Sequence, residues 1–385
     1  MRALQISKYY PPIMGGIESV TWELAEGLNR SGVCCDVLCS NQRLFTQRDR
    51  AASGYEIVRA GSLGTLMSTS VAPTMAGQLR RMARRADLLH VHMPDPMAAA
   101  ALWLTRPRLP LIVHWHSDVV RQRIALKAYE PLQRWLLQRA DAIIATSEAY
   151  AEASDVLRAW RTKVAVIPIG ISDNRGHGCS SKAAAIGQRF RRRKLVFALG
   201  RMTYYKGFEV LIDAAAALPD DCAVLIGGDG ELLERYRTLV RRRGLSGKVH
   251  LPGHIADDDL PSYFEACDVF CMPSTVRAEA YGVAMLEAMV MGKPIVAADI
   301  AGSGVPWVNQ PGVTGLNVPV GQPVALADAL RSLLADDSML ARFGAAARRR
   351  YLDEFTAERM TARTIELYRR VMPVAQSRAA PTEVF

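Results

Sequence analysis

Short apolar segments alternate with helix-length segments along most of the chain, and this alternation restricts the fold more than any other feature. In the first half the apolar segments cover residues 3–7, 34–39, 88–92, 111–114, 142–146 and 164–167, and in the second half they cover 195–199, 223–226, 269–272 and 295–297. Strands that alternate with helices usually lie parallel in one sheet. The sequence therefore predicts an α/β fold with two Rossmann-like domains, each a doubly wound parallel sheet.

The alternation stops between residues 172 and 193, where turn-forming residues and a basic run indicate an exposed linker. We therefore expect an N-terminal domain over 1–172, a linker over 173–193 and a C-terminal domain over 194–355. A further helix is predicted at about 356–372, packed back onto the N-terminal domain. Two such domains bring the carboxyl ends of their strands to a central cleft, which is the usual binding position in open α/β sheets.

The chain of 385 residues carries a formal net charge of +10, which favours a polyanionic partner such as nucleic acid, an anionic membrane surface or a phosphorylated substrate. Nucleic acid would require aromatic residues interleaved with the basic ones or a known docking motif, and the sequence has neither. The seven cysteines are odd in number and lack paired metal spacing, which is typical of a reduced cytoplasmic protein. We predict no signal peptide and no membrane-spanning helix, because no apolar stretch reaches about 18 residues.

Two carboxylates eight residues apart, Glu279 and Glu287, form the most specific pattern in the sequence. Glu279 precedes a predicted helix and Glu287 lies inside it, with Gly282 near the helix start. A helix N-terminus with a nearby glycine exposes unpaired amides, which suits a diphosphate, and Glu287 can accept hydrogen bonds from ribose hydroxyls. The alternative is that both glutamates are solvated or capping residues at a helix start.

Two cations at a strand-to-helix turn strengthen the diphosphate interpretation. Arg201 follows the strand predicted at 195–199, and Lys206 lies five residues later, directly before Gly207 and the next helix. Positive charge at this position can neutralise a leaving nucleoside diphosphate, on which negative charge grows in the transition state.

Together these motifs resemble those of the retaining glycosyltransferase family 4. The resemblance extends over nearly the whole chain and includes Tyr10-Pro11-Pro12, Gly15-Gly16-Ile17-Glu18, His116-Ser117-Asp118, Pro168-Ile169-Gly170-Ile171, Glu287-Ala288-Met289 and Gly312-Val313-Thr314-Gly315-Leu316. It implies the GT-B architecture, in which two Rossmann-like domains face a central cleft. It also implies transfer of a sugar from a nucleotide diphosphosugar with retention of the anomeric configuration.

The resemblance further implies a role for each matching residue. The residues expected to bind the donor are Gly16, Arg201, Lys206, Gly282, Val283 and Glu287. Arg201, Lys206 and the amides at the helix start would hold the diphosphate, Glu287 the ribose, and the candidate catalytic residue Glu279 the hydroxyls of the donor sugar. Gly16 would let the backbone approach donor and acceptor closely. Neither a cofactor nor a metal ion is expected.

His116 is the second candidate catalytic residue. It shares one face of a predicted strand with His114, and in the family the histidine at this position lies near the reacting sugar. A neutral imidazole there can hydrogen-bond the donor sugar or steady developing charge. His90 and His92 end the neighbouring strand, so a four-histidine metal site is an alternative, but no carboxylate or cysteine completes a recognisable ligand set.

Basic residues gather on two predicted helices of the N-terminal domain. Arg80, Arg81, Arg84 and Arg85 lie opposite an apolar stripe, and Arg123 and Lys127 do so on the second helix. Such a surface can dock on anionic lipid and meet a lipid-linked acceptor, or it is an ordinary solvated helix face. We therefore expect a cytoplasmic protein that associates peripherally with the inner face of the cell membrane.

The resemblance also narrows the substrate class. The stretches 114–118 and 303–309 are similar to those of bacterial enzymes that build O-antigen and exopolysaccharide repeat units, many of which use GDP-mannose. The predicted reaction is transfer of a hexose, α-mannose from GDP-mannose, onto a lipid-linked saccharide acceptor of a surface polysaccharide such as lipopolysaccharide. A UDP-sugar donor, a nucleotide-sugar hydrolase or epimerase on the same scaffold, and a basic nucleic-acid-binding protein are the alternatives.

Overall fold

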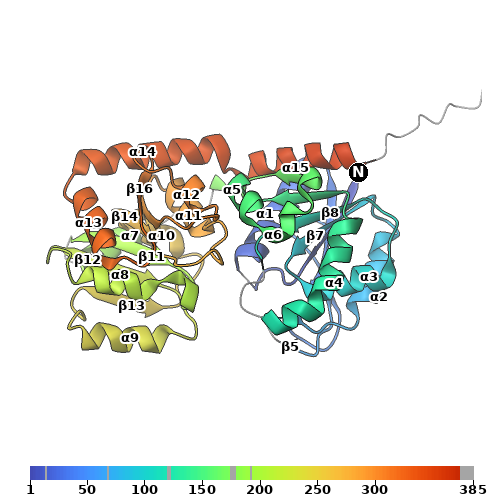
Figure 1. Ribbon diagram of the computed structural model, residues 1–385, viewed down its shortest axis with the longest axis horizontal. Helices are drawn as coiled ribbons and strands as arrows, with labels where there is room; N and C mark the ends of the chain where they lie inside the picture. The colour runs from blue at the N-terminus through green and yellow to red at the C-terminus, as the bar shows by residue number, and fades with distance from the viewer. Residues whose placement is uncertain (14, 67–68, 119–122, 174–178, 191–192, 373–385) are drawn as a thin grey trace, which may run out of the picture.

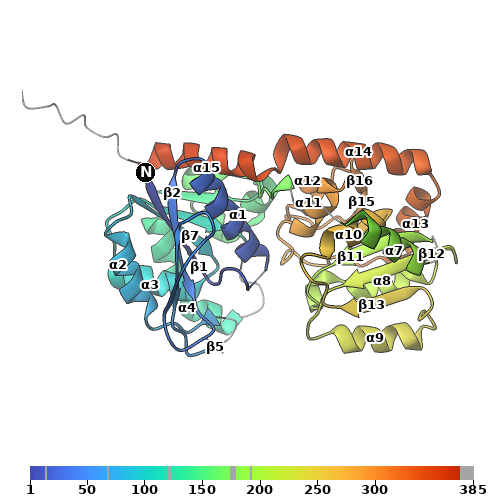
Figure 2. The same cartoon turned by 180° about the vertical axis from the view of Figure 1, so that it is seen from behind.

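The computed structural model describes residues 1–13, 15–66, 69–118, 123–173, 179–190 and 193–372, and of residues 123–128 the backbone alone. Two α/β domains lie side by side, and the last two helices run along one edge of both (Figure 1). The view from behind shows the same two layered units (Figure 2). This arrangement confirms the predicted α/β fold with two Rossmann-like domains.

The N-terminal domain is built on an eight-stranded sheet with the order β10-β9-β8-β7-β1-β2-β4-β3, in which β3 runs antiparallel to β4 and the other pairs are parallel. Its strands are β1 (Arg2–Ser7), β2 (Cys34–Ser40), β3 (Gln47–Arg50), β4 (Glu56–Ala60), β7 (Leu88–Met93), β8 (Leu111–Trp115), β9 (Ala142–Ala145) and β10 (Val164–Val166), and a separate hairpin joins β5 (Thr65–Leu66) and β6 (Thr69–Ser70). Every residue of β7, β8 and β9 is buried, as expected for parallel strands covered on both faces.

Helices cover both faces of this sheet. The N-terminal helices are α1 (Gly16–Arg30), α2 (Met75–Ala83), α3 (Pro96–Thr105), α4 (Arg123–Arg139), α5 (Glu148–Ala153), α6 (Asp155–Arg158) and the 3-10 turn η1 (Arg161–Lys163). The apolar side of α1 packs with α15 (Ala357–Val371) on one face, whereas α2, α3 and α4 pack on the other. The C-terminal helix thus completes the core of the N-terminal domain.

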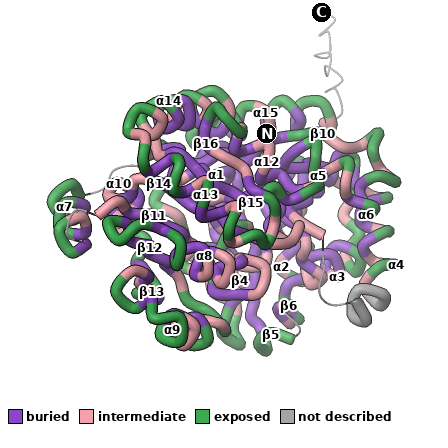
Figure 3. Tube along the Cα trace, turned by 60° about the vertical axis from the view of Figure 1, so that its left-hand side comes forward, coloured by how far each residue is buried: buried purple, intermediate pink, exposed green. Residues whose placement is uncertain are grey.

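The C-terminal domain contains a six-stranded parallel sheet with the order β13-β12-β11-β14-β15-β16. Its strands are β11 (Lys194–Leu199), β12 (Cys222–Gly227), β13 (Val249–Gly253), β14 (Val269–Met272), β15 (Ile295–Ala298) and β16 (Gly315–Val318). Its helices are α7 (Ser180–Arg189), η3 (Tyr204–Lys206), α8 (Phe208–Ala215), α9 (Leu233–Arg242), α10 (Leu260–Ala266), α11 (Val283–Val290), α12 (Val305–Val308), α13 (Pro323–Leu334) and α14 (Asp337–Glu354). Figure 3 shows that the central strands are buried while α9 and α14 expose their outer sides.

The structure differs from the sequence expectation in the linker. Residues 180–189 form α7, which packs on α10 and buries Ala183 and Ile186. Cys179 N donates to Ser262 Oγ at 3.2 Å and fixes the start of this helix. The apolar residues of this helix are three consecutive alanines and Ile186, so its periodicity is too weak to distinguish it from a loop in the sequence.

Two chain segments cross between the domains and lie against each other. Ile171 N donates to Phe355 O at 2.9 Å, and Ala357 N donates to Ile171 O at 2.9 Å. One buried apolar cluster continues across this crossing, from the face of the N-terminal sheet under α1 to Tyr281 and Phe355. The two domains therefore share a packed junction beside the crossing. Among the helices that the structure describes, none has the length and apolar character needed to cross a membrane.

Candidate active site

Lys206 and Glu279 meet at the carboxyl end of the C-terminal sheet. η3 follows β11, and the loop 273–282 follows the neighbouring strand β14. Lys206 Nζ lies 2.6 Å from Glu279 Oε2, and the two side chains are only 13% and 10% exposed. Burial alone would lower the pKa of Lys206, but the carboxylate of Glu279 outweighs it and the pKa is raised above its usual value. The ammonium is therefore charged at neutral pH.

The approach of the two loops depends on a glycine. Gly207 has a φ of 63°, and a Cβ at this position would lie 2.2 Å from Pro273 O. Thr275 N donates to Tyr205 O at 2.8 Å and joins the same loops through their backbones. A larger residue at 207 would force the loops apart, and with them Lys206 and Glu279.

Two serines donate hydrogen bonds to Glu279, one to its carboxylate and one to its backbone oxygen. Ser274 Oγ donates to Glu279 Oε2 at 3.1 Å, and Ser303 Oγ donates to the Glu279 backbone oxygen at 2.5 Å. One carboxylate oxygen thus accepts from both Lys206 and Ser274. These two serines were not predicted as site residues, because serine is common in loops and its presence in a sequence gives little indication of a role.

The helix that follows this loop begins with unpaired amides. Gly282 is the N-cap of α11 with a φ of 83°, and no side chain among the described residues caps this helix start. Among the described residues, the amides of Val283 and Ala284 are therefore available to an anion, whereas Met285 N already donates to Gly282 O at 2.9 Å. Glu287 lies one turn further along α11 and is partly exposed. Gly282, Val283 and Glu287 thus lie three to eight residues after Glu279 in the chain.

Arg201 faces the first turn of α1 from the other domain. Burial raises the pKa of Glu18 in that turn, while the positive charges of Lys8 and Arg201 oppose the rise. Arg201 itself is exposed, as is Gly16, the first residue of α1. The predicted donor residues from the two domains therefore lie on opposing surfaces.

Arg277 joins the two domains next to these residues. Its Nη2 lies 2.6 Å from Asp118 Oδ2, and its Nη1 donates to Ala153 O at 2.6 Å. Asp118 also accepts from Trp115 Nε1 at 2.9 Å and from Ser154 Oγ at 2.8 Å. Arg277 is not among the residues predicted from the sequence, because a lone arginine in a loop gives no indication of a partner 159 residues away.

His116 belongs to an array of four stacked imidazoles at the ends of β7 and β8. The histidine array consists of His90, His92, His114 and His116, whose adjacent ring centroids are 4.2 to 5.4 Å apart. Burial lowers the pKa of every ring, to about 3 for His90 and His116 and well below 6.5 for the other two, with further lowering of His90, His92 and His114 by neighbouring histidines. The rings are therefore neutral at physiological pH.

The same array contains the geometry that prompted the metal alternative. One ligand atom from each of His90, His92 and His114 lies within 4.8 Å of the others. Both ring nitrogens of His92 are hydrogen-bonded and His90 Nε2 lies 3.3 Å from His114 Nδ1, whereas His114 Nε2 is buried without a hydrogen-bond partner among the described residues. That these histidines bind no metal ion thus stays a prediction. The contacts describe rings that are hydrogen-bonded to one another and to neighbouring side chains.

The predicted basic surface is only partly a helix face. Arg80 and Arg81 lie in the last turn of α2, but α2 ends at Ala83, so Arg84 and Arg85 fall at and beyond its end. Arg85 pairs with Glu56, which also pairs with Arg48. The prediction of four arginines on one helical face is therefore wrong in its geometry, because the helix is shorter than its apolar pattern. The side chains of Arg123 and Lys127 lie outside the described residues.

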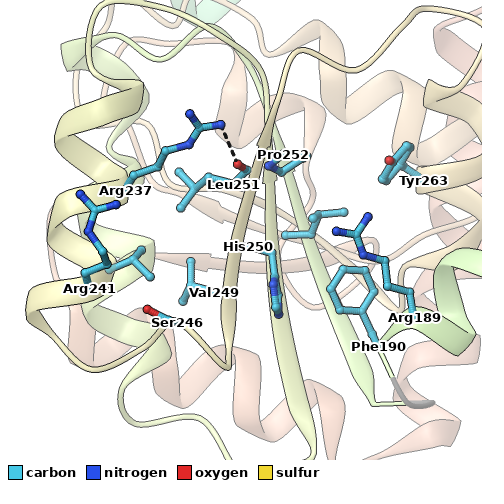
Figure 4. Close-up of a pocket in the computed structure, with 12 residues that line it drawn as sticks. Arg189, Phe190, Arg237, Arg241, Ser246, Val249, His250, Leu251, Pro252 and Tyr263 are labelled. Atoms are coloured by element: carbon cyan, nitrogen blue, oxygen red, sulfur yellow. Dashed lines mark hydrogen bonds between the residues drawn. The ribbon is translucent and has the colours of Figure 1, made fainter.

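A pocket of about 280 Å³ lies at the outer edge of the C-terminal sheet, beside β13 and between α7 and α9. Figure 4 shows Arg189, Arg237 and Arg241 around it, with Arg237 donating to Leu251 O at 3.2 Å. Within the described residues, its lining includes none of those predicted to bind the donor. The pocket is therefore separate from the candidate active site.

Family models match both domains. The model described as glycosyl transferases group 1 matches residues 182–350, and the model of a glycosyl transferase 4-like domain matches residues 15–170. Each domain thus carries its own family signature, which spans the C-terminal sheet from β11 to β16 and every strand of the N-terminal sheet except β1.

Whole-length relatives agree with these models. The chain is 31% identical to O-antigen chain mannosyltransferase C of Escherichia coli over 371 residues, covering 96% of this chain and 98% of the relative. It is 33% identical to D-rhamnosyltransferase WbpZ of Pseudomonas aeruginosa, covering 93% of each chain. The crystal structure of Anabaena HepE in complex with UDP-glucose superposes with a TM-score of 0.78 at 22% identity, over 96% of this chain and all of that one, and supports the fold.

Proposed function

The chain belongs to the glycosyl transferases group 1 family and is a glycosyltransferase, and we propose that it transfers a hexose from a nucleotide diphosphosugar with retention of the anomeric configuration. The observation that carries the proposal is the buried pair of Lys206 and Glu279 beside the start of α11. This pair combines a permanent positive charge with a hydroxyl-binding carboxylate at strand ends, where open α/β sheets bind ligands.

The diphosphate of the donor would be held from three sides. The ammonium of Lys206 has three N–H donors, so it can keep its bond to Glu279 and still donate to phosphate oxygens. The guanidinium of Arg201 and the first amides of α11 add further donors. Negative charge grows on this diphosphate as the glycosidic bond breaks, so these donors stabilise the transition state more than the bound substrate.

The sugar and the ribose would be recognised by carboxylates. Glu279 would accept from hydroxyls of the hexose through Oε1, because Oε2 already accepts from Lys206 and Ser274. Glu287, one turn into α11, would accept from the ribose hydroxyls. His116 would meet the hexose from the N-terminal domain.

We favour GDP-mannose as the donor and a saccharide of a bacterial surface polysaccharide as the acceptor. The support for mannose and for this acceptor is the name of the relative that is 31% identical over nearly its whole length, an O-antigen chain mannosyltransferase. A UDP-sugar is the second candidate, because a neighbour of the same fold binds UDP-glucose. A donor of either kind would use the same diphosphate contacts.

A membrane surface next to the cleft would supply a lipid-linked acceptor. Four large apolar side chains after β2 and β4 are 58 to 73% exposed, three of them in loops and the fourth in the short strand β5. We call them the apolar loop patch: Leu44, Phe45, Leu63 and Leu66. Ser62 N donates to Arg43 O at 2.8 Å, so the two loops form one surface. Tyr9 OH lies 2.9 Å from Thr65 Oγ1, which ties this surface to the loop that leads to Gly16.

The apolar loop patch is continuous with the start of α2. Thr46 Oγ1 lies 3.2 Å from Thr74 Oγ1, the N-cap of that helix, and the exposed Arg80, Arg81 and Arg84 lie at its far end. Apolar side chains flanked by arginines are typical of proteins that bind anionic bilayers peripherally. We propose that this face contacts the inner leaflet of the cell membrane and presents the cleft to a lipid-linked saccharide.

The reaction is tested by the stereochemistry of the product. Purified protein is incubated with GDP-mannose and a synthetic saccharide acceptor carrying a lipid diphosphate, and the anomeric proton of the new linkage is followed by NMR from the first turnovers. An α-linked mannoside from the α-configured donor is expected. A β-linked product would contradict retention, and release of free mannose in place of a linked product would favour a hydrolase.

A further inference from the structure

A buried polar chain leads from the middle of the N-terminal sheet to His116. His92 Nε2 lies 2.5 Å from Gln5 Oε1, and His92 Nδ1 lies 2.8 Å from His116 Nε2. The three residues come from β1, β7 and the end of β8, which are adjacent strands of one sheet. A glutamine side chain inside an otherwise apolar strand is unusual, and Gln5 is completely buried.

The chemistry of these three side chains determines which atom donates and which accepts in each of the two hydrogen bonds. An amide oxygen only accepts, so His92 must carry its proton on Nε2. Burial and the neighbouring histidines keep His92 neutral by lowering its pKa, so its Nδ1 has a lone pair and accepts. His116 must then donate from Nε2, and because burial lowers its pKa to about 3, it is neutral as well.

Among the residues that the structure describes, one polar side-chain atom of His116, Nδ1, has no hydrogen-bond partner and is open to a ligand. With Nε2 donating to His92, Nδ1 carries the remaining lone pair and can only accept. Among the four rings, His116 is the most exposed at 5%, whereas the others are at 0 to 1%. His116 is thus the end of the chain that lies nearest to solvent.

We propose that Gln5 and His92 are positioning residues that hold His116 in the Nε2–H tautomer, so that its Nδ1 is an obligatory acceptor for a hydroxyl of the donor sugar. This inference rests on the proposed function and specifies the polarity of one contact in it. Of the two roles that a neutral imidazole can play here, it selects the acceptance of a sugar hydroxyl and excludes donation to a developing negative charge.

His90 packs against His92 and restricts the orientation of its ring. Tyr368 OH lies 2.6 Å from His90 Nδ1, and the rings of His90 and His92 are stacked with their planes 9° apart. Tyr368 of helix α15 therefore fixes His90 by a hydrogen bond, and His90 in turn packs against the ring of His92. A rotation of His92 that would break its bonds to Gln5 and His116 is blocked by this stack.

The tautomer is measured directly in the unmodified protein. Long-range proton–nitrogen NMR on protein labelled with ¹⁵N at histidine distinguishes protonated from bare ring nitrogens, and histidine variants assign the signals. We expect Nε2–H for both His92 and His116 from pH 8 to pH 5.5. Protonation of His116 at Nδ1 would mean that the amide of Gln5 is reversed, and it would overturn the inference.

Two variants of Gln5 separate positioning from structure. Gln5→Leu removes the acceptor, and we expect a mixture of His116 tautomers and roughly tenfold weaker binding of the nucleotide sugar, with unchanged binding of the nucleoside diphosphate alone. Gln5→Glu keeps an acceptor oxygen at the same position and replaces only the amide group, which lies near the thiol of Cys35. It should restore both the tautomer and the affinity.

The possible failures are distinct. If Gln5→Leu changes neither the tautomer of His116 nor the difference in affinity between the nucleotide sugar and the nucleoside diphosphate, the positioning role is refuted. The glycosyltransferase assignment is unaffected by that result. If the unmodified protein binds neither GDP-mannose nor UDP-glucose, the proposed donor site fails instead, and the tautomer result then describes a structural contact. Loss of nucleoside diphosphate binding in Gln5→Leu with an intact melting temperature would also contradict the inference.

Discussion

Arg277 Nη2 lies 2.6 Å from Asp118 Oδ2, so the loop that carries Glu279 is tied directly to the strand end that carries His116. The Arg277 and Asp118 side chains are 28% and 12% exposed, and the guanidinium also lies over the ring of Tyr150. An ion pair with this much burial and several hydrogen bonds is costly to break from one side. The pair therefore couples the position of one candidate catalytic residue to that of the other.

Replacement of Arg277 by alanine should loosen the two domains and slow the reaction. We expect kcat/KM to fall on the order of tenfold or more, because Asp118 loses its cationic partner and the two loops separate. Steady-state kinetics and the radius of gyration from small-angle scattering measure both effects. The control is Arg158→Ala, which removes an exposed ion pair to Asp155 and should change neither. Unchanged kinetics in Arg277→Ala would remove this pair from the account.

Replacement of Lys206 by alanine should abolish most of the activity. Loss of a charge that stabilises the transition state typically costs on the order of 100-fold in turnover, and the carboxylate of Glu279 would in addition lose its partner. Initial rates with saturating donor measure the effect. Lys194→Ala serves as the matched control, because Lys194 pairs with Asp337 at the other end of β11. Near-normal turnover of Lys206→Ala would show that this lysine is not in the site.

Replacement of Glu287 by glutamine should weaken nucleotide binding in a way that depends on the ribose. We expect the affinity for GDP to fall about tenfold, because the amide presents one acceptor where the carboxylate presents two. The affinity for 2′,3′-dideoxy-GDP should be the same in both proteins. Isothermal titration calorimetry measures all four affinities. An equal loss for both nucleotides would place Glu287 away from the ribose.

The histidine array should make the protein sensitive to acid. The folded-state pKa values lie well below 6.5, so the unfolded chain binds more protons than the folded protein as the pH falls below about 6.5. Each ring then removes up to about 1.4 kcal/mol of stability per pH unit down to its folded pKa, and stability is fully retained above pH 6.5. Urea unfolding at pH 7.5, 6.0 and 5.0 measures the slope.

The contribution of one ring can be isolated. His114→Phe keeps a planar ring in the stack but cannot be protonated, so its pH slope should be shallower by about one proton. Leu104→Ser, at an exposed position without a titratable side chain, should keep the slope of the unmodified protein. Equal slopes in all three proteins would mean that the array does not control acid stability.

Binding to vesicles should depend on the apolar loop patch. Exchange of Leu44 and Phe45 for serine removes two apolar side chains that are 73% and 58% exposed, and we expect at least about tenfold weaker partition onto vesicles containing anionic phospholipid. Sedimentation of sucrose-loaded vesicles measures the partition. Val324→Ser changes an equally exposed residue of the C-terminal domain and is the control. Unchanged partition of the double variant would assign membrane contact to another surface.

Local patterns in the sequence were sufficient for the fold and for much of the candidate site. The strands are continuous apolar runs, which parallel sheets require, and Lys206 and Glu279 lie in turns that follow two of them. Adjacent parallel strands end at the same edge of a sheet, so two such turns meet even though they are 73 residues apart in the chain. Lys206 and Glu279 come into contact because β11 and β14, the strands that precede their turns, are neighbours in the sheet.

The contacts that a sequence could not reveal are those between domains and those set by single polar atoms. The bond between Arg277 and Asp118 depends on how the two domains pack, which no local period encodes. The link from Gln5 to His116 depends on the register of β1, β7 and β8, in which Gln5 lies opposite His90. A buried glutamine in an apolar strand is a usable signal, but its partner is known only once the strands are aligned.

The most direct test of the account is a thermal-shift comparison of GDP-mannose, UDP-glucose, ADP-glucose and dTDP-glucose on the unmodified protein and on Lys206→Ala, without added metal. A donor present at about 100 times its dissociation constant stabilises the folded state by roughly 2.7 kcal/mol, which is a clear rise in melting temperature. The account predicts stabilisation of the unmodified protein, strongest with GDP-mannose, and loss of that stabilisation in Lys206→Ala. No response to any nucleotide diphosphosugar, or an equal response in both proteins, would contradict it.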